Sequence, residues 1–313
     1  MSRGVVVVVG AANLDLISYV PRLPAAGETL HGSSFQMGYG GKGANQAVMA
    51  AKLGSSVAMV AKLGTDVFGD GTLENFREQG VDTTHVHRTD AAFSGVAPIA
   101  VDPHGANAII IVTGANDLLT IDEIEQARPS IAAAGVIVCQ LEIPLEVTAA
   151  ALRVAREEGV PTILNPAPAR EQLPDELYRH ADILCPNEPE TSLLTGGPVD
   201  TLEQATEQAQ LLRERGTAAV VLTLGERGCL VVDDQGATSL PSEDVEVVDT
   251  TGAGDAFVGS LAHFLAGGVD LRDAAARASR LAAISVTGRG TQSSFPDAAR
   301  VPAELLAPFV NGD

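Results

Sequence analysis

The sequence predicts an α/β fold: a doubly wound, mainly parallel sheet flanked by helices, with a small β-sheet lid. Two observations lead to this prediction. From residue 122 onward, apolar runs of strand length alternate with amphipathic segments of helix length. The stretches at about 14–38 and 93–114 instead contain short alternating segments broken by proline and glycine, a pattern typical of hairpins. We expect residues 1–313 to form a single domain, with these two stretches as the lid within it.

The first half of the chain begins with a run of five valines that ends at Gly10 and predicts a buried strand. A hairpin is expected to turn at 102–105, and its apolar face, which carries Ile109 and Ile111, must cover the active site, a second subunit, or both. The elements expected here are strands over 5–10, 57–63, 95–101 and 107–112, a helix that ends near 54, and a helix around 71–79.

In the second half, we expect strands over 136–141, 162–164, 182–185, 220–224 and 245–248, and helices over 145–158, 201–215, about 255–267 and about 272–286. Polar or glycine residues recur where the strands end. Because the carboxyl ends of parallel strands form one edge of a sheet, this recurrence favours a ligand crevice there. The residues concerned are Asn13, Glu142, Asn165, Asn187 and Gly225.

The net charge of −20 comes from 40 acidic and 20 basic residues. This excess argues against nucleic acid or an anionic membrane surface as a partner, although a nucleotide needs only a local positive pocket. The N-terminal valine run is too short to span a membrane and lacks the cleavage region of a signal peptide. Cys139, Cys185 and Cys229 are widely spaced in apolar runs, as buried reduced thiols would be. We therefore expect a cytoplasmic protein.

The stretch from 245 to 257 combines a predicted strand with a glycine-rich helix start at 252–254. Glycines there leave backbone N–H groups exposed, and the helix dipole adds partial positive charge, so an anion fits. Asp255 lies in the first turn, and the local sequence leaves two interpretations of it equally open. It is a favourable residue near a helix N-terminus. It is equally suited to act as a general base beside an anion hole during phosphoryl transfer.

The glycine-rich segment at 38–47 leads into a predicted helix. It fails the pattern of a Walker A loop, because Gln36 occupies the first glycine position and Gly43 follows the lysine. The spacing of a dinucleotide-binding loop is present, but the segment does not directly follow the first strand, so a nicotinamide-dependent dehydrogenase is disfavoured. What remains is a helix start that presents Lys42 and Asn45, whose hydrogen-bonding groups suit a ligand with several hydroxyls.

Two signatures now resemble the ribokinase/PfkB family of sugar kinases. One is Gly40-Gly41-Lys42-Gly43-Ala44-Asn45-Gln46-Ala47, and the other is Asp249-Thr250-Thr251-Gly252-Ala253-Gly254-Asp255-Ala256-Phe257. Between them, the segments at 165–170, 186–188 and 223–225 match in order, so the resemblance spans almost the whole chain. The second signature marks the wider family. The lysine-containing first signature is more similar to the ribose-specific branch than to fructose or adenosine kinases.

The resemblance implies roles for individual residues. Asp255 would be the catalytic base, and Gly252, Ala253 and Gly254 would form the anion hole. The sugar would contact Asn13, Leu14, Asp15, Gly41, Lys42, Gly43, Ala44, Asn45, Glu142 and Asp255. The nucleotide would contact Asn187, Thr223, Leu224, Gly225, Glu226, Arg227, Gly228, Gly254, Asp255 and Ser279, the last where an imidazole can flank the adenine in relatives. A monovalent cation would be held by Asp249, Thr251, Ser285, Gly288, Gly290 and Ser294, and Glu190 would lie near the water shell of Mg²⁺.

The function that the resemblance implies is ATP-dependent phosphorylation of D-ribose at O5, with Mg²⁺ and a monovalent cation, K⁺ expected. ATP and D-ribose would be the small-molecule partners, and a homodimer would form through the lid sheet. Two alternatives stay open. The chain could be a kinase of the same family for another sugar or nucleoside, such as deoxyribose or adenosine. It could also be a sugar-binding regulator that kept the fold without the chemistry.

Overall fold

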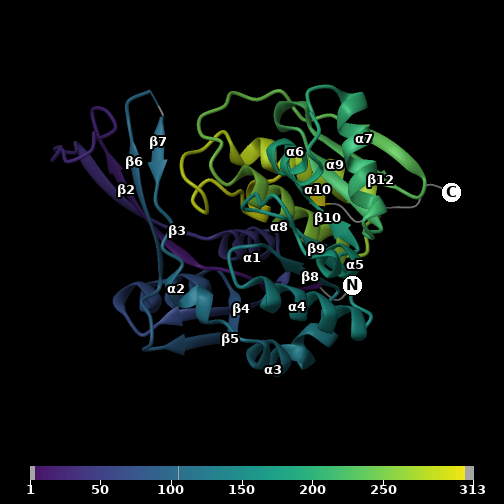
Figure 1. Ribbon diagram of the computed structural model, residues 1–313, viewed down its shortest axis with the longest axis horizontal. Coiled ribbons are helices and arrows are strands. Elements are labelled where there is room, and N and C mark those ends of the chain that lie inside the picture. The colour runs from purple at the N-terminus through teal and green to yellow at the C-terminus, as the bar shows by residue number, and fades with distance from the viewer. Residues whose placement is uncertain (1–3, 105, 307–313) are drawn as a thin grey trace.

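The computed structural model describes residues 4–104 and 106–306, and these form a main sheet with helices on both faces and a second, smaller sheet (Figure 1). The strand order of the main sheet among these residues is β13-β12-β11-β10-β9-β8-β1-β4-β5. All neighbours pair in parallel except β11 with β12 and β12 with β13. The strands are β1 (Val5–Val9), β4 (Ser56–Gly64), β5 (Val81–Thr89), β8 (Val136–Cys139), β9 (Thr162–Leu164), β10 (Ile183–Leu184), β11 (Ala219–Thr223), β12 (Cys229–Asp233) and β13 (Gly236–Leu240). The prediction of a mainly parallel α/β sheet is confirmed.

The helices divide between the two faces of this sheet. Val6 and Val8 of β1 belong to one hydrophobic cluster and Val7 and Val9 to the other, which explains why the strand is valine throughout. The first face is covered by α1 (Lys42–Lys52), α2 (Val67–Glu78), α8 (Ala253–Ala266) and α9 (Leu271–Ser285). The other is covered by α3 (Ile121–Ala132), α4 (Leu145–Glu157), α5 (Asp175–His180), α6 (Glu188–Thr195) and α7 (Leu202–Glu214). The short turns η1 (Gly114–Leu118), η2 (Gly225–Arg227) and η3 (Ala298–Arg300) and the helix α10 (Ala303–Leu306) complete the described chain.

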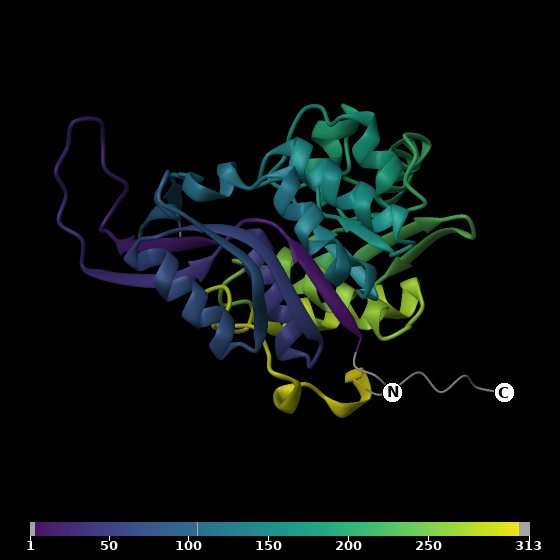
Figure 2. The same ribbon diagram turned by 90° about the horizontal axis from the view of Figure 1, so that it is seen from below.

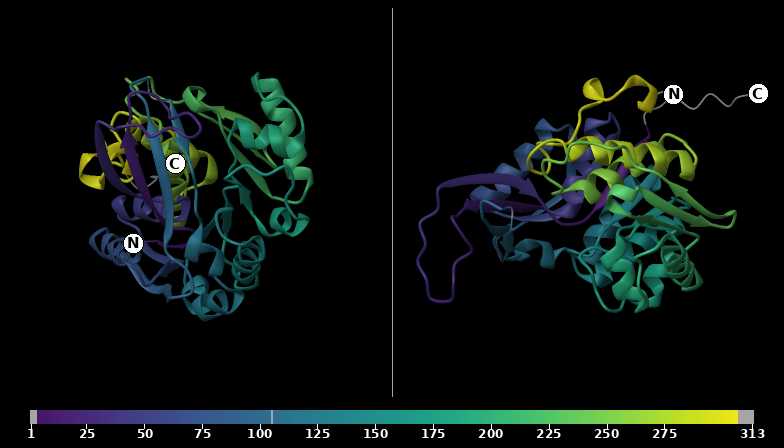
Figure 3. Two further views of the ribbon diagram at one scale, coloured as in Figure 1. Left: turned by 60° about the vertical axis from the view of Figure 1, so that its left-hand side comes forward. Right: turned by 90° about the horizontal axis from the view of Figure 1, so that it is seen from above.

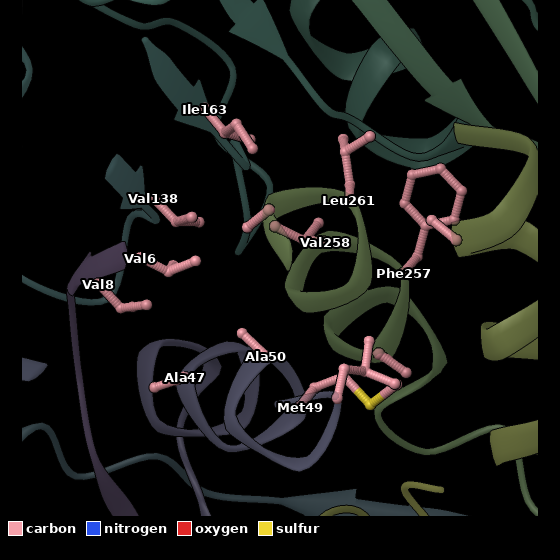
Figure 4. Close-up of a cluster of buried hydrophobic side chains, with 14 of the residues drawn as sticks. Val6, Val8, Ala47, Met49, Ala50, Val138, Ile163, Phe257, Val258 and Leu261 are labelled. Carbon is pink, nitrogen blue, oxygen red and sulfur yellow. The ribbon is translucent and has the colours of Figure 1, made fainter. Parts of the chain in front are cut away.

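Helices α1 and α8 lie against each other as well as against the sheet. Figure 4 shows Ala47 and Ala50 of α1 and Val258 and Leu261 of α8 facing the strands. Gly259 lies at the crossing, where an added Cβ would be 2.6 Å from the Gln46 carbonyl oxygen and 2.7 Å from the Met49 Cβ. A glycine is therefore required for this close approach. Because Gly259 lies in the second turn of α8, the N-terminal ends of the two helices are brought together.

The second sheet, with the order β3-β2-β6-β7, stands away from the body (Figure 2), and Figure 3 shows it from two further sides. It consists of β2 (Asn13–Tyr19), β3 (Ser34–Gly40), β6 (Gly95–Val101) and β7 (Asn107–Ile109). These strands lie in the two stretches predicted for the lid. Strand β2 follows β1 after three residues, and β3 leads into α1. Both strands of the second sheet therefore connect to the main body near the carboxyl end of β1. The boundaries of the domain itself stay a prediction.

The two faces of the second sheet differ. Directly paired residues share a face, and the register pairs Ile17 with Ile99 and Ile99 with Ile109, so Ile109 lies on the face that also carries Asp15. Phe35 and Met37 lie on the opposite face and are 57% and 64% exposed. The face with Ile109 is thus turned toward the groups described below, while the Phe35 face is uncovered.

Three expectations about elements need correction. The predicted strand at 245–248 is wrong: this segment is irregular, and its valines alternate with acidic residues on the surface without a neighbouring strand. Its backbone is held only by the Val248 and Asp249 N–H groups, which both donate to the Val286 carbonyl, at 2.8 and 3.1 Å. Helix α2 begins at Val67 rather than near 71, because Asp66 caps it. Strand β7 ends at 109 rather than 112, and Gly105 of the predicted turn lies outside the described residues.

Among the residues that the structure describes, no helix is both long and apolar enough to cross a membrane.

Candidate active site

The carboxylate of Asp255 lies where the N-terminal ends of α1 and α8 meet, and it is 7% exposed. The Asn45 side chain donates to Oδ2 at 2.8 Å, and the Gln46 side chain donates to Oδ1 at 2.9 Å. Neither oxygen accepts from the backbone N–H groups of its own helix, so this aspartate is not a helix cap. Asp255 is thus an acidic residue in the first turn of α8, as the first interpretation expects, and its carboxylate is held by side chains of the neighbouring helix α1.

The start of α8 offers unpaired N–H groups. Gly252 has a φ of 79°, in the left-handed region, and it precedes a helix of 14 residues. The N–H groups of Gly254 and Asp255 donate to no acceptor among the described residues. A Cβ added to Gly254 would meet nothing within 4 Å, so the space in front of these groups is open. This is the geometry of an anion site at a helix N-terminus.

Lys42 is the cation of this region. Its backbone N–H donates to the Glu142 carboxylate at 2.8 Å. Burial opposes the charge of its ammonium group, but Asp255, Glu142 and Glu190 favour it more strongly, and the pKa of Lys42 is raised. The ammonium group makes no hydrogen bond or ion pair with any residue in the described ranges. A half-buried, charged ammonium group without a partner among the described residues suits an anionic ligand group.

Asp15 and Asn13 lie at the base of the second sheet. Burial raises the pKa of Asp15 to about 6, and the nearby charges of Glu142 and Asp255 add to the effect. Gly40 permits this arrangement, because a Cβ there would be 2.5 Å from the Asp15 carboxylate oxygens. The Asn13 side-chain oxygen accepts from the Asn116 side chain at 2.8 Å, so the turn η1 fixes its orientation.

The segments predicted to hold a monovalent cation are joined by Asp249. One of its oxygens accepts from the Thr251 N–H and hydroxyl at 2.9 and 2.6 Å, and the other accepts from the Gly290 N–H at 2.9 Å. The Ser294 N–H and hydroxyl donate to the Thr291 carbonyl, at 3.1 and 2.9 Å. The structure therefore brings 249–251 and 290–294 together. Ser285 remains in α9, where its hydroxyl donates to the Ala282 carbonyl at 2.8 Å.

The residues predicted to contact a nucleotide fall into two groups. Asn187, which follows β10, pairs with Thr223 at the end of β11, and Arg227 forms an ion pair with Glu188. Asn187 and Glu190 cap α6 reciprocally: the Glu190 N–H donates to the Asn187 side chain at 2.8 Å, and the Asn187 N–H donates to the Glu190 carboxylate at 2.9 Å. Burial raises the pKa of Glu190. Ser279 comes from another element, 5% exposed on α9, which packs against β12.

Sequence reasoning missed several side chains that complete the site. They are the amides of Gln46, Gln140, Asn116 and Gln292, together with Asn165, which was noted only as a strand end. Gln46 gave a usable signal, because a glutamine within an alanine-rich, buried helix needs a polar partner. The others gave none, since each meets its partner across a gap of more than 90 residues.

We predict that the Asp15 carboxyl group of the ligand-free protein titrates near pH 6, as followed by ¹³C NMR of the side chain. Glu142→Gln should lower the midpoint, because it removes a negative charge that favours the protonated form. Since the pKa of Asp15 in the folded protein lies above the ordinary value of 3.8, this group alone lowers the free energy of unfolding as pH rises between the two values. Glu146→Gln, on the first turn of α4, is the control. A midpoint near 4 in the unaltered protein would contradict the burial of Asp15.

Comparison with known proteins places this geometry in a family. Residues 4–298 match the family described as pfkB family carbohydrate kinase. The chain is 43% identical to a ribokinase from Mus musculus over 305 residues, which cover 96% of this chain and 94% of that protein. It is 42% identical to a deoxyribokinase from Salmonella typhimurium over 291 residues, with 93% and 95% covered. The structure of Arabidopsis thaliana ribokinase complexed with ribose and ATP superposes with a TM-score of 0.89 at 33% identity, covering 97% of this chain and 98% of that one.

The family match spans both signatures, both sheets and every group of side chains described above. This chain therefore belongs to the pfkB family of carbohydrate kinases and is a phosphotransferase.

Proposed function

We propose that this protein transfers the γ-phosphoryl group of ATP to O5 of D-ribose. The observation that carries the proposal is the carboxylate of Asp255, which α1 holds beside the unpaired N–H groups at the start of α8. A general base and an anion hole are thereby adjacent, as in-line phosphoryl transfer requires. The similarity to ribokinases from Mus musculus and Arabidopsis thaliana supports ribose as the sugar.

In the proposed reaction, Asp255 accepts the proton of the sugar O5 hydroxyl as the oxygen attacks phosphorus. The N–H groups of Gly254 and Asp255 stabilise the negative charge on the transferred group, because they are unpaired and lie at the positive end of a helix. The Lys42 ammonium group, which has no partner among the described residues, can stabilise the same negative charge on the transferred group. The bond between the γ-phosphorus and the bridging oxygen breaks, and ADP leaves.

The sugar hydroxyls would be bound by polar side chains around Lys42. Asp15 and Glu142 accept hydrogen bonds, and Asn13 and Asn45 each offer an amide. The face of the second sheet that carries Asp15 and Ile109 would cover the sugar, which would exclude water from the transfer. Glu190 would hold Mg²⁺ through a water molecule, and the ion would neutralise charge on the phosphates.

A second candidate substrate is 2-deoxyribose. The deoxyribokinase from Salmonella typhimurium is about as similar to this chain as the mouse ribokinase, at 42% against 43% identity. The two sugars differ by one hydroxyl group. A site that forms hydrogen bonds with this hydroxyl strongly rejects the sugar that lacks it, because the polar groups of the site would then be left unpaired.

A coupled ADP-release assay with Mg-ATP and K⁺ tests the proposal on D-ribose, 2-deoxyribose, fructose, adenosine and no sugar. We expect turnover with D-ribose, and Asp255→Asn should lower it by about 10²–10⁴-fold through loss of the base. Asp270→Asn, at the N-cap of α9, is the matched control, because asparagine caps a helix equally well. Undiminished turnover of Asp255→Asn would refute the mechanism. Turnover with 2-deoxyribose alone would identify that sugar as the substrate. An absence of turnover with every compound would favour a sugar-binding regulator.

We also propose a K⁺ site formed by Asp249 and the carbonyl and hydroxyl groups of 251 and 285–294. The support is the network in which Asp249 links 249–251 to Gly290 and so fixes the loops beside the anion hole. We expect turnover to rise with K⁺ more than with Na⁺ at equal ionic strength. Asp249→Asn removes a negative charge, so half-activation should need several-fold more K⁺. Equal rates of desalted enzyme with and without K⁺ would remove this proposal.

We further propose that the face of the second sheet carrying Phe35 and Met37 binds a second copy of the chain. Both side chains are more than half exposed, and the sheet stands clear of its own body. Light scattering after gel filtration should therefore give the mass of a dimer, and Met37→Glu should give that of a monomer. Leu211→Glu, at an exposed leucine of α7, is the control. An unaltered protein with the mass of a monomer would exclude the dimer.

A further inference from the structure

Two chains of buried amides end on the two oxygens of Asp255. In the first, Gln46 donates to Oδ1 of Asp255 at 2.9 Å and to the Asn165 side chain at 3.1 Å, and accepts from Gln140 at 2.6 Å. In the second, Asn45 donates to Oδ2 at 2.8 Å and accepts from Gln292 at 3.0 Å.

The second chain continues beyond the loop. The Gln292 side-chain oxygen accepts from Asn75 of α2 at 3.0 Å, and the Gln292 carbonyl accepts from the Lys52 ammonium at 2.9 Å. Asn165 in turn donates to the Cys185 carbonyl at 2.9 Å. The two chains therefore reach from one carboxylate to helices α1 and α2, to the residues that follow β8, β9 and β10, and to the loop after α9.

Apart from Lys52, which donates to a backbone carbonyl, every side chain that links these two chains to Asp255 is a carboxamide. Each of the two amides that touch Asp255 donates an N–H to a different carboxylate oxygen, so both oxygens are held in place. The chains are also buried: Gln46 and Gln140 are fully buried, and Asn75 and Gln292 are 7% and 9% exposed. Polar groups in such surroundings hold a fixed geometry, because any other orientation leaves one of them without a partner.

We propose that Gln46 and Gln292 are positioning residues for the phosphoryl transfer: they hold the carboxylate of Asp255 in place and aimed at the sugar hydroxyl. The inference rests on the proposed role of Asp255 as the base. It assigns to Gln292, on the loop after α9, a part in catalysis that it exercises through Asn45.

Gln46 differs from Asn45 in one respect that can be measured. Gln46 is fully buried behind Asp255 and has no exposed atom with which to bind a sugar. Its replacement should therefore lower kcat and leave the KM for the sugar nearly unchanged, since KM follows contacts with the substrate in the ground state. Loss of a sugar contact would instead raise KM.

The first variant is Gln46→Glu, which keeps the shape of the side chain and places a second carboxyl group against Asp255. Two carboxyl groups in contact share a proton, so the acid limb of the kcat profile should move upward by about one pH unit or more. We expect kcat at pH 7 to fall by roughly 10–100-fold, because a displaced or protonated base loses that much. The other titratable groups that face Asp255 are Asp15 on β2, Lys42 on α1, Glu142 after β8 and Glu190 on α6, and all four remain.

Gln208→Glu is the matched control. Gln208 is also a buried glutamine, 6% exposed, but it lies on α7, which packs against α6, β11 and β12. It should share any general cost of burying a carboxyl group, seen as a lower melting temperature, without a shift in the pH profile. If Gln46→Glu folds and its profile and kcat equal those of the unaltered enzyme, the proposal is overturned. A lower melting temperature with an unshifted profile overturns it as well, because that result is purely structural.

Gln292→Met decides the question if Gln46→Glu does not fold. Methionine is similar in size to glutamine and removes both hydrogen bonds of the side-chain amide. Gln292 lies in a loop rather than in the core of a helix, so folding is less at risk. At saturating K⁺, kcat should fall several-fold with the KM for ATP unchanged, and a kcat equal to that of the unaltered enzyme would overturn the proposal. The failures are separable: an active Asp255→Asn enzyme removes the proposed function itself, whereas an inactive one with unaffected glutamine variants removes only this inference.

Discussion

The close contact between α1 and α8 at Gly259 determines where the reactive groups lie. A Cβ there would meet the Gln46 carbonyl oxygen at 2.6 Å, so any larger residue would separate the two helices. Their contact brings Asn45 and Gln46 to Asp255, although the residues are more than 200 positions apart in the chain. Both helices lie on the same face of the sheet through apolar residues, which include Ala47, Val258 and Leu261 (Figure 4). The polar site is therefore held in register by a hydrophobic core directly beneath it.

The site combines negative carboxylates with a local region of positive potential, although the whole molecule is strongly negative. The chain carries a net charge of −20, and Asp15, Glu142, Glu190 and Asp255 all lie near Lys42. Burial, and to a lesser degree repulsion between the carboxylates, raises the pKa of Asp15, Glu142 and Glu190. Positive potential comes from the Lys42 ammonium and from the N–H groups at the start of α8. A sugar with many hydroxyls suits the acidic part, and a phosphate suits the positive part.

Much of this arrangement could be predicted from the sequence, because it depends on local patterns. The valine run of β1, the glycines before α8 and the Lys42–Asn45 pair each lie within one short segment whose chemistry can be interpreted without a structure. The strand expected at 245–248 was wrong for the same reason: its alternation of valine and acidic residues was genuine, but a strand also needs a neighbour, which periodicity does not supply. Asn116 and Gln292 could not be found, because polar residues in loops carry no periodicity and their partners are 103 and 247 positions away.

The position of Asp15 has a mechanical consequence. It lies on β2, two residues after the pair formed by Asn13 with Gly40 on one side and Gly95 on the other, so it moves only when the second sheet moves. In the proposed reaction, a sugar hydroxyl bound by Asp15 would pull on β2, and the second sheet would tilt as a unit about the Asn13–Gly40 pair. The free energy of sugar binding would then include the work of tilting the sheet. The stiffness of the outer part of β3 would thus influence the affinity, although no side chain there contacts the sugar.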